Sequence, residues 1–497
     1  MTPLSCGPVA FALKRKLYAA AGLVLLAACA SAPVRSNPGA ERAVAADLDH
    51  IFGASLTDHA LWGVEVKSLD TGRIWYARNA RTLMMPASNM KIVTLAAAVR
   101  TLGWDHRFKT SIEAIGPIED GTLRGNLFVR GSGDPSLNTR NNRGAAFIDD
   151  VAAALKSAGI TSITGAVVAD DDAFDDTGLG QGWSWDYLQD DYAAPSGALE
   201  FNENIAKLVL TPGSPGDAAS VTLSPGAGYQ LANHATTGEA GSTTRIDIGR
   251  RASEAVLDIT GSIPSGASPV SRDVAVVNPT VYFAQSLRNG LVERGIGVNG
   301  GGVDLDDVRT AIEPGTRRVL FEAQSPPLSE IATVMMKVSQ NLYAETLLKA
   351  VGAATSGSGT AEAGRDAARE IFAGWNVPGT YVQADGSGLS RYDYVTAEML
   401  VAILEHFHAD QAFIATLPIA GKDGTVSTRM RATRAEANAV AKTGSISNVR
   451  ALSGYVKTRD GETLAFSVLA NNFTVPAATI NWMTDLAVET LANYTMK

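Results

Sequence analysis

The chain has 497 residues, of which 45% are hydrophobic, and its formal net charge is −9. This length is sufficient for several hydrophobic cores, and the acidic balance argues against a nucleic-acid backbone as partner. Only two cysteines occur, Cys6 and Cys29, so removal of an N-terminal segment would leave no disulfide pair. The six histidines are scattered and no nucleotide-binding fingerprint occurs, so we expect no metal site and no cofactor.

The N-terminal residues have the pattern of a secretory signal. Residues 14–16 are basic, and residues 17–28 form an apolar run that is too short to span a bilayer. This run ends in Leu26-Ala27-Ala28-Cys29, which resembles the bacterial lipobox. We therefore expect a lipoprotein signal peptide at 1–28 and lipid on Cys29. An ordinary signal peptide is the alternative.

The segment after the predicted cleavage site has no clear periodicity. Residues 29–46 are mostly small and include proline, and they predict a tether between a lipid anchor and the folded body. Ala30, rather than Asp, follows Cys29, a pattern that favours outer-membrane sorting in Gram-negative bacteria. We therefore expect a periplasmic protein that is attached to the membrane, and specifically the outer membrane, through Cys29.

Alternating residues predict strands near both ends of the chain. Trp62–Lys67 and Arg73–Ala77 flank an Asp-Thr-Gly turn and predict a hairpin. Towards the C-terminus, Ala439–Lys442 predicts a strand, and Ala451–Lys457 with Thr463–Ala470 predicts a second hairpin. These strands could form one five-stranded antiparallel sheet, so both ends of the chain would share one domain.

Helical patterns lie next to these strands. Ser88–Leu102 predicts a helix that is apolar on more than one face, and therefore buried, with Gly103 as its end. Ala477–Tyr494 predicts a helix at the back of the chain, and we expect it to cover the same face of the sheet as the front helix at Ser88–Leu102. Helical patterns also occur at Pro279–Arg294 and at Leu328–Val351.

The middle of the chain has a different composition. Residues 104–272 are rich in Gly, Pro, Asp, Ser and Thr, with short alternating strands and one helical stretch at Ala145–Ala158. We expect an α/β (α+β) fold in which a main domain, residues 47–112 and 271–497, is interrupted by inserted β-rich subdomains at 113–270.

Three short motifs carry candidate chemistry. They are Ser88-Asn89-Met90-Lys91, Ser339-Gln340-Asn341 and Lys442-Thr443-Gly444-Ser445. The first and third occur once in the chain, whereas the Ser-x-Asn pattern occurs also at 136–138 and is weak by itself. Together, in this order and on these predicted elements, the three motifs indicate a serine nucleophile with its supporting groups.

The first motif pairs a nucleophile with a base. Positions i and i+3 lie on one face of a helix, so Lys91 can take the proton from Ser88. Lys91 must be neutral for this step, and burial together with a second cation, Lys442, would lower its pKa. Ser88 at a helix N-terminus places backbone N–H groups beside the developing oxyanion, and Ser445 could supply another.

The other two motifs complete the predicted site. Ser339 can pass a proton to the leaving amine, and Asn341 can hold both the lysine base and the substrate backbone. Lys442, Thr443 and Ser445 can bind a carboxylate, which indicates a substrate that ends in a free carboxyl group.

The set resembles the motifs of the penicillin-recognising serine enzymes, namely penicillin-binding proteins and serine β-lactamases. Further stretches resemble the low-molecular-mass class C penicillin-binding proteins, which are D-alanyl-D-alanine carboxypeptidases and endopeptidases. These stretches are Gly131–Pro135, Phe201–Asn204, Asp385–Arg391 and Leu452–Tyr455. The resemblance extends from about Leu48 to the C-terminus.

This resemblance implies a penicillin-binding-protein/serine β-lactamase-like catalytic domain at 47–112 and 271–497. It also implies that the insertion forms two subdomains. The distance in sequence between Ser88 and Ser339 is larger than a β-lactamase-sized domain allows. The resemblance further implies that Asp385–Arg391 lies near the cleft, with Arg391 as a substrate-binding residue. A glycine-rich turn without a role in the site is the alternative for this stretch.

The implied activity is that of a serine D,D-peptidase. The resemblance implies hydrolysis of D-Ala-D-Ala in peptidoglycan stem peptides, with endopeptidase cleavage of D-Ala-diamino acid cross-links as a further activity, and covalent inhibition by β-lactams. Two alternatives are a serine β-lactamase and a non-catalytic penicillin-binding sensor or scaffold. The chain lacks the Glu-x-x-Leu-Asn pattern of class A β-lactamases, and its intact motifs argue against a sensor. It also has no Gly-x-Ser-x-Gly nucleophile elbow.

Overall fold

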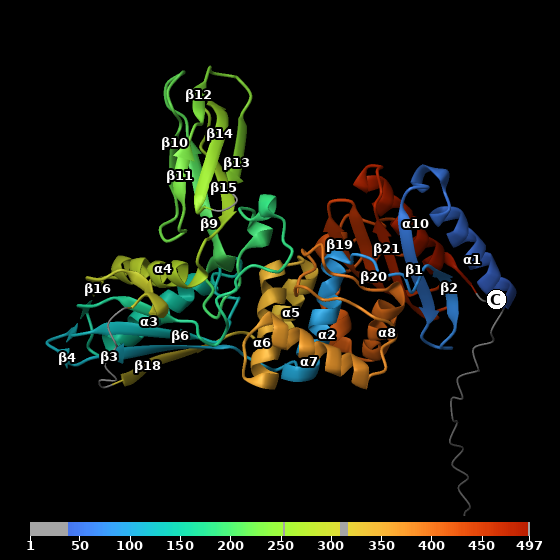
Figure 1. Ribbon diagram of the computed structural model, residues 1–497, viewed down its shortest axis with the longest axis horizontal. Helices are drawn as coiled ribbons and strands as arrows, with labels where there is room; N and C mark the ends of the chain where they lie inside the picture. Colours follow the sequence, from blue (N-terminus) through green and yellow to red (C-terminus); the bar gives the residue numbers. More distant parts are fainter. Residues whose placement is uncertain (1–37, 252–253, 309–316, 496–497) are drawn as a thin grey trace, which may run out of the picture. The chain divides into compact units, whose positions relative to one another are not determined.

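The structure is a computed structural model of the chain and describes residues 38–251, 254–308 and 317–495 (Figure 1). The predicted signal peptide, Cys29 and the predicted tether as far as residue 37 lie outside these residues. None of the helices in the described ranges combines the length and apolar character that a bilayer-crossing segment needs.

A five-stranded antiparallel sheet organises the domain that contains both ends of the described chain. Its strand order is β19-β20-β21-β1-β2, and each neighbouring pair is antiparallel. The strands are β1 (Leu61–Ser68), β2 (Ile74–Arg78), β19 (Val440–Ile446), β20 (Val449–Lys457) and β21 (Thr463–Asn471). The predicted sheet, with two strands from the front of the chain and three from the back, is confirmed.

Two helices from the chain's ends pack together on one face of this sheet. They are α1 (Pro38–Phe52) and α10 (Ala477–Asn493), and they contact each other and the sheet. Val44 and Leu48 of α1 and Val488 of α10 are buried in the same hydrophobic core as the inward-facing residues of the sheet. Both helices therefore cover a single face. The predicted front helix is not one of them: α2 (Met90–Leu102) packs in the other core, so the prediction that the helices at Ser88–Leu102 and Ala477–Tyr494 share one face is wrong.

Helix α1 corrects the predicted tether at 29–46. Residues 38–46 are part of the helix, and the Val44 side chain is 0% exposed. Val44 and Leu48 are one helical turn apart, so they lie on the same face and are covered by the sheet. This face is narrow and the rest of the segment is mostly alanine and polar residues, which concealed the helical pattern in the sequence.

A second layer of helices covers the opposite face of the sheet. Ala451 and Tyr455 of β20 and Leu469 of β21 point into this core, while Leu452 and Phe466 point into the other one. This division follows from the alternation of side chains along a strand. The helices of this layer are α2 (Met90–Leu102), α5 (Leu328–Lys337), α6 (Asn341–Ser356), α7 (Ala361–Gly374), α8 (Ala397–Phe407) and α9 (Gln411–Thr416).

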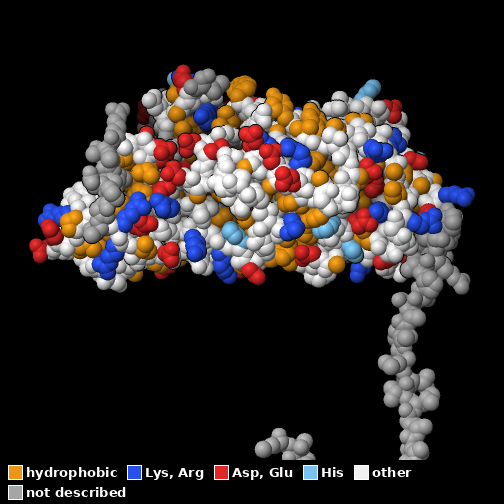
Figure 2. Space-filling model, turned by 60° about the horizontal axis from the view of Figure 1, so that its bottom comes forward, with side chains coloured by type: hydrophobic (Ala, Val, Ile, Leu, Met, Phe, Trp, Pro, Cys, Tyr) orange, Lys and Arg blue, Asp and Glu red, His pale blue; other side chains and the backbone are white. Residues whose placement is uncertain are grey.

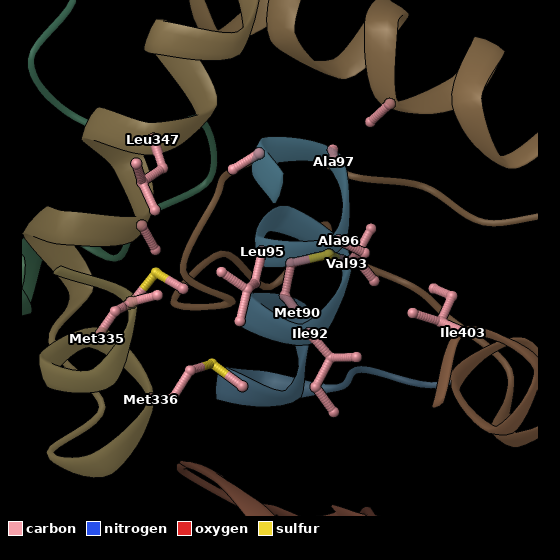
Figure 3. Packing of buried hydrophobic residues seen from close by; sticks show 14 of the residues in the cluster. Met90, Ile92, Val93, Leu95, Ala96, Ala97, Met335, Met336, Leu347 and Ile403 are labelled. Carbon is pink, nitrogen blue, oxygen red and sulfur yellow. The ribbon is translucent and has the colours of Figure 1, made fainter. Parts of the chain in front are cut away.

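Helix α2 lies inside this layer and is surrounded by other helices. Figure 3 shows its side chains with those of α5, α6 and α8 around them, namely Met90, Ile92, Val93, Leu95, Ala96 and Ala97 with Met335, Met336, Leu347 and Ile403. A helix that is apolar on several faces must be enclosed in this way to bury its surface. The helix ends at Gly103, as predicted.

The first inserted subdomain is a mixed sheet with two helices. The sheet order is β17-β8-β6-β3-β18, and a small second sheet has the order β16-β7-β5-β4. Phe147 and Val151 of α3 share a core with Phe283 and Leu287 of α4. The elements are β3 (Lys109–Ile115), β4 (Ile118–Glu119), β5 (Thr122–Leu123), β6 (Asn126–Gly131), α3 (Arg143–Ser157), β7 (Ser162–Ile163), β8 (Val167–Asp170), α4 (Pro279–Glu293), β16 (Gly297–Val298), β17 (Gly302–Asp304) and β18 (Arg317–Gln324).

The predicted limits of the insertion, 113–270, are therefore wrong. The limit at residue 113 divides β3, and α4 to β18 belong to the inserted subdomain rather than to the predicted catalytic segment 271–497. Strand β18 pairs with β3 along its length, and α4 packs on β8 and β17. Pairing between strands so far apart in sequence leaves no local signal, so the change in composition near residue 272 was mistaken for a boundary.

The second inserted subdomain consists of strands. In sequence it is an insertion within the first subdomain, between β8 and α4. One sheet has the order β10-β9-β15, and in the other β14 pairs with β11, β12 and β13. In Figure 1 these strands form one group, and Leu208, Leu210, Leu257 and Ile259 are buried in a core of their own. The strands are β9 (Ile205–Thr211), β10 (Ser220–Leu223), β11 (Gln230–Asn233), β12 (Thr236–Gly238), β13 (Arg245–Arg250), β14 (Val256–Pro264) and β15 (Val270–Ala275).

Surface charges of both signs lie close together. On the face drawn in Figure 2, acidic and basic side chains are interspersed. Among the exposed charges of the described residues, Arg251 pairs with Asp258 at 2.8 Å and Lys422 pairs with Glu436 at 2.7 Å. Exposed pairs of this kind contribute little to stability, so the fold depends mainly on its hydrophobic cores.

We expect the second inserted subdomain to be removable without loss of the remaining fold. Ile205 and Ala275 are paired across β9 and β15, so a short Gly-Ser linker can replace residues 206–274. The variant should give soluble protein with a cooperative thermal unfolding transition, because the excised strands have their own core. Removal of α4 (279–293) is the control and should prevent folding, because Phe283 and Leu287 lie in the core of the first subdomain. Loss of cooperative unfolding in the 206–274 variant would contradict this domain assignment.

Candidate active site

The three predicted motifs meet at one cavity of about 360 Å³. The first motif comes from a 3-10 turn (Ala87–Asn89) and the start of α2, the second from the start of α6, and the third from β19. The residues that line the cavity are Ser88, Tyr187, Tyr192, Ser339, Asn341, Gly388, Leu389, Thr425, Thr443, Ser445, Ile446 and Ser447.

Lys91 is the centre of the hydrogen-bond network behind Ser88. Its Nζ lies 3.0 Å from Ser88 Oγ, 2.6 Å from Asn341 Oδ1 and 2.8 Å from the carbonyl oxygen of Ser387. The side chain is 0% exposed. It therefore does not reach solvent, and the helical i, i+3 spacing directs its amine to the serine hydroxyl.

Burial changes the proton affinity of both lysines in the site. It lowers the pKa of Lys91 from 10.5 to about 7, against the opposing effect of the Asp385, Glu345 and Asp393 carboxylates. Burial and the charge of Lys91 also lower the pKa of Lys442 well below its usual value. A substantial fraction of Lys91 is therefore neutral near pH 7, the state that a general base requires.

Ser339 is held by the second lysine. Lys442 Nζ donates to Ser339 Oγ and to the carbonyl oxygen of Thr443, both at 2.8 Å. Ser339 has a φ of 63°, a left-handed backbone conformation that is uncommon for a residue other than glycine. Such local strain is often found at functional sites, and here it accompanies a hydroxyl that faces the cavity.

The start of α6 orients the middle motif. Gln340 caps this helix, because its Oε1 accepts the N–H of Leu342 at 3.1 Å, and its Nε2 donates to Glu203 at 2.8 Å. Asn341 donates from Nδ2 to the carbonyl oxygen of Tyr192 at 2.7 Å while its Oδ1 faces Lys91. The second residue of the motif thus supports its neighbours rather than the cavity itself.

Strand β19 is an edge strand, and its free side faces the cavity. The N–H of Ala441 points outward, since it donates to Pro418 O at 2.9 Å across that edge. The N–H groups of alternate residues along a strand share one direction, so that of Ser445 also points outward. The N–H groups of Ser88 and Ser445 can therefore form an oxyanion hole. A Cβ at Gly444 would lie 2.5 Å from Pro86 O, so this close approach requires glycine.

The remaining predicted residues lie at or beside the cavity. Thr443 and Ser445 line it, and Thr443 Oγ1 lies 2.7 Å from Thr425 Oγ1. Arg391 is not among the lining residues; its Nη2 lies 3.4 Å from Tyr187 Oη and 3.3 Å from Ser447 O, both on cavity residues. The predicted stretch 385–391 does reach the site, through Ser387, Gly388 and Leu389.

Sequence reasoning missed three residues of the cavity wall. Tyr187 and Tyr192 lie on short 3-10 turns in the segment that links the two inserted subdomains, and Thr425 lies on another such turn before β19. None belongs to a recognisable motif, so no signal in a single sequence could have identified them. Across the described ranges, no three His, Cys, Asp or Glu side chains are grouped so that they could hold a metal ion.

Comparison with known proteins agrees with this geometry. The family D-Ala-D-Ala carboxypeptidase 3 (S13) matches residues 44–493. The D-alanyl-D-alanine carboxypeptidase of Actinomadura sp. (strain R39) is 36% identical over 452 residues, which cover 87% of this chain and 81% of that protein. D-alanyl-D-alanine carboxypeptidase DacB of Haemophilus influenzae is 28% identical over 421 residues, which cover 83% and 85% of the two chains.

Solved structures show the same fold. The crystal structure of penicillin binding protein 4 (dacB) from Haemophilus influenzae has a TM-score of 0.77 and 26% identity, and the match covers 90% of this chain and 99% of that one. Its complex with a novel β-lactam has a TM-score of 0.73. With a family match over nearly all of the described residues, the chain belongs to the D-Ala-D-Ala carboxypeptidase 3 (S13) family and is a serine-type D-Ala-D-Ala carboxypeptidase.

Proposed function

We propose that the chain hydrolyses the D-Ala-D-Ala bond of peptidoglycan stem peptides through an acyl-enzyme on Ser88. The observation that carries this proposal is the 3.0 Å contact between Ser88 Oγ and the Nζ of Lys91, whose pKa burial lowers to about 7. A serine hydroxyl needs such a base to become a nucleophile.

In the acylation step, neutral Lys91 takes the proton from Ser88 Oγ as this oxygen attacks the carbonyl carbon of the penultimate D-Ala. The carbonyl oxygen becomes an oxyanion between the N–H groups of Ser88 and Ser445. Ser339, which is hydrogen-bonded to Lys442, passes a proton to the leaving amine nitrogen as the C–N bond breaks. D-Ala leaves, and an ester on Ser88 remains. The proton that Lys91 took replaces, through the Ser339–Lys442 pair, the one that Ser339 gave to the leaving amine, so Lys91 is neutral again.

In the second step, water attacks the ester carbonyl and transfers a proton to Lys91, which then gives it to the departing serine oxygen. The C–O bond to Ser88 breaks, and the shortened stem peptide leaves with a new carboxylate. Attack by an amine would instead form a new peptide bond. The same acyl-enzyme arises from a terminal D-Ala-D-Ala or from a D-Ala-diamino acid cross-link, because both leaving groups are amines.

The wall formed by β19 supports recognition of a terminal carboxylate. The hydroxyls of Thr443, Ser445 and Thr425 lie along one side of the cavity, and the Lys442 amine lies behind them. Hydroxyl donors together with a nearby amine suit a carboxylate. Arg391 lies beside this wall, and we assign it to binding of the distal part of the stem peptide.

We also propose that β-lactams acylate Ser88 and that the adduct is long-lived. The structure of the Haemophilus influenzae relative in complex with a β-lactam supports the acylation. The residues that line the cavity include no aspartate or glutamate, so no lining carboxylate is placed to activate a water for rapid hydrolysis of the adduct. This favours a D,D-peptidase over the alternative of a β-lactamase.

A lipid anchor on Cys29 and a periplasmic location at the outer membrane remain part of the proposal. They are supported by the basic segment, the apolar run and the Leu-Ala-Ala-Cys sequence alone. An anchored peptidase would work on peptidoglycan within reach of the chain between Cys29 and α1.

Substitution of Lys91 tests the assigned base. Lys91→Ala should lose labelling of Ser88 by a fluorescent penicillin and release of D-Ala from a pentapeptide, because no other amine contacts this hydroxyl in the described part of the chain. Lys91→Arg should not restore either activity, since arginine does not give up its proton near neutral pH. Peptide mass mapping of the adduct and a D-Ala release assay give the two readouts.

The matched control is Lys67→Ala. Lys67 lies on β1, and its Nζ pairs with Glu405 at 2.6 Å. This variant should label Ser88 at the wild-type rate. A label on another serine in the wild-type protein, or normal labelling of Lys91→Arg, would contradict the site assignment.

The pH dependence of acylation should follow the protonation of Lys91. Only the neutral amine accepts the serine proton, so the rate should rise with pH and reach half of its plateau near pH 7, where burial places this pKa. Stopped-flow labelling from pH 5 to pH 9 measures the profile. A half-maximum near pH 10, the range of an exposed lysine, would show that Lys91 is not buried as described.

Substitution of Cys29 tests the anchor. Cys29→Ser should release the protein from the membrane fraction, because serine cannot carry the thioether-linked lipid. Fractionation followed by mass analysis of the mature N-terminus measures this. A Cys29→Ser protein that stays in the membrane fraction as wild type does would contradict the lipid anchor.

A further inference from the structure

A buried carboxylate lies one helical turn beyond Asn341. Glu345 follows Asn341 by four residues on α6, so both side chains lie on the same face. The Glu345 side chain is buried, and its two oxygens accept the backbone N–H groups of Gly386 at 2.9 Å and Ser387 at 2.8 Å. The proposed chemistry does not use this residue.

The Gly386–Ser387 backbone that Glu345 binds also forms a hydrogen bond with Lys91. The carbonyl oxygen of Ser387 accepts a hydrogen bond from Lys91 Nζ at 2.8 Å, and the carbonyl oxygen of Gly386 accepts one from Thr94 Oγ1 at 2.7 Å. Lys91 and Thr94 are both on α2. The Gly386–Ser387 segment is therefore held by α6 through its N–H groups and by α2 through its carbonyl groups.

This segment has no room to shift towards α6. A Cβ at Gly386 would lie 2.4 Å from the carbonyl oxygen of Ala344. Glu345 also borders a separate cavity of about 280 Å³, which Lys349 and Arg365 line as well. The cavity that Glu345 borders is therefore lined partly by polar side chains.

We propose that Glu345 is a positioning residue for the base. Its carboxylate fixes the Ser387 carbonyl that orients Lys91 Nζ towards Ser88, and it places a negative charge behind the amine. This inference rests on the proposed function, in which Lys91 is the base.

The charges around Lys91 define what this carboxylate does. Asp385 and Asp393 face it from the loop that contains Ser387, Lys442 faces it from β19, and Glu345 faces it from α6. The three carboxylates raise the pKa of Lys91, whereas burial lowers it. Burial also raises the pKa of Glu345 to about 7, so this group is ionised in the pH range where the amine is neutral.

Both parts of the role depend on the chemistry of the carboxylate. The two backbone donors are bonded to different oxygens of the carboxylate, and an amide of the same shape puts an NH2 group in place of one of them. A neutral side chain also removes the negative charge that stabilises the protonated amine. Loss of the Glu345 charge should therefore change both the rate of acylation and its pH dependence. If Glu345 only filled space, replacing its carboxylate with an amide of the same shape would change neither quantity.

Glu345→Gln in the full chain separates these effects from simple support of the fold. Labelling of Ser88 by a fluorescent penicillin on the high-pH plateau should slow about tenfold or more, because one backbone donor loses its acceptor and the base moves. The half-maximum of the pH profile should move to lower pH. Glu462→Gln is the matched control: Glu462 is also buried, accepts a hydrogen bond from Ser68 and should alter neither quantity.

Glu345→Asp provides a second, charge-retaining variant. It should be slower than wild type, because the shorter side chain cannot reach both N–H groups, yet its half-maximum should stay at the wild-type pH. If Glu345→Gln does not give a cooperative thermal unfolding transition, this variant carries the test, and a wild-type rate for it overturns the inference.

The remaining outcomes are distinct. A Glu345→Gln protein with either the wild-type plateau rate or the wild-type half-maximum overturns the positioning role while leaving the proposed function intact. A wild-type protein that is not labelled on Ser88 overturns the proposed function and this inference together.

Discussion

The burial of two lysine amines side by side is the constraint on which the site depends. Lys91 and Lys442 are both 0% exposed, and the charge of Lys91 contributes to lowering the pKa of Lys442. Taking an ammonium group out of water is costly unless it is neutralised or surrounded by acceptors. The fold meets this cost with hydroxyl, amide and carbonyl oxygens around both amines, and with carboxylates behind Lys91. The same arrangement leaves the Lys91 amine able to be neutral near pH 7.

The architecture brings these groups together from distant parts of the chain. Helix α2 carries Lys91 into the helical layer, where its apolar faces are covered on several sides, and the 3-10 turn before it carries Ser88. The start of the edge strand β19 is bonded to Pro418 through the N–H of Ala441, whereas the outward N–H of Ser445 lies beside the cavity and can bind a substrate. The inserted part contributes as well: the carbonyl oxygen of Tyr192 holds Asn341, and the indole of Trp183 donates to Asp385 at 2.8 Å. The inserted part of the chain thus forms part of the cavity wall.

The motif residues were predictable because their chemistry is local. Ser88 and Lys91 are one helical turn apart, and Lys442 to Ser445 follow one strand, so spacing alone shows which side chains can act together. The five-stranded sheet was predictable from alternation and turn residues. The tether was predicted too long because the apolar face of α1 is narrow, and the insertion was predicted too short because β18 pairs with β3. Tyr187, Tyr192 and Thr425 have no motif, and Glu345 acts through backbone groups that have no sequence signature.

The sequence by itself determined which serine and lysine stand one helical turn apart, the residues of the other two motifs and the type of sheet that carries them. These follow from short-range periodicity and from the properties of each side chain. Only the tertiary structure decided which segments form the rest of the wall, where the inserted subdomains begin and end, and how far burial lowers the pKa of Lys91. The physical reason is that long-range strand pairing and desolvation depend on residues far apart in the chain, and their positions are defined only once the cores have formed.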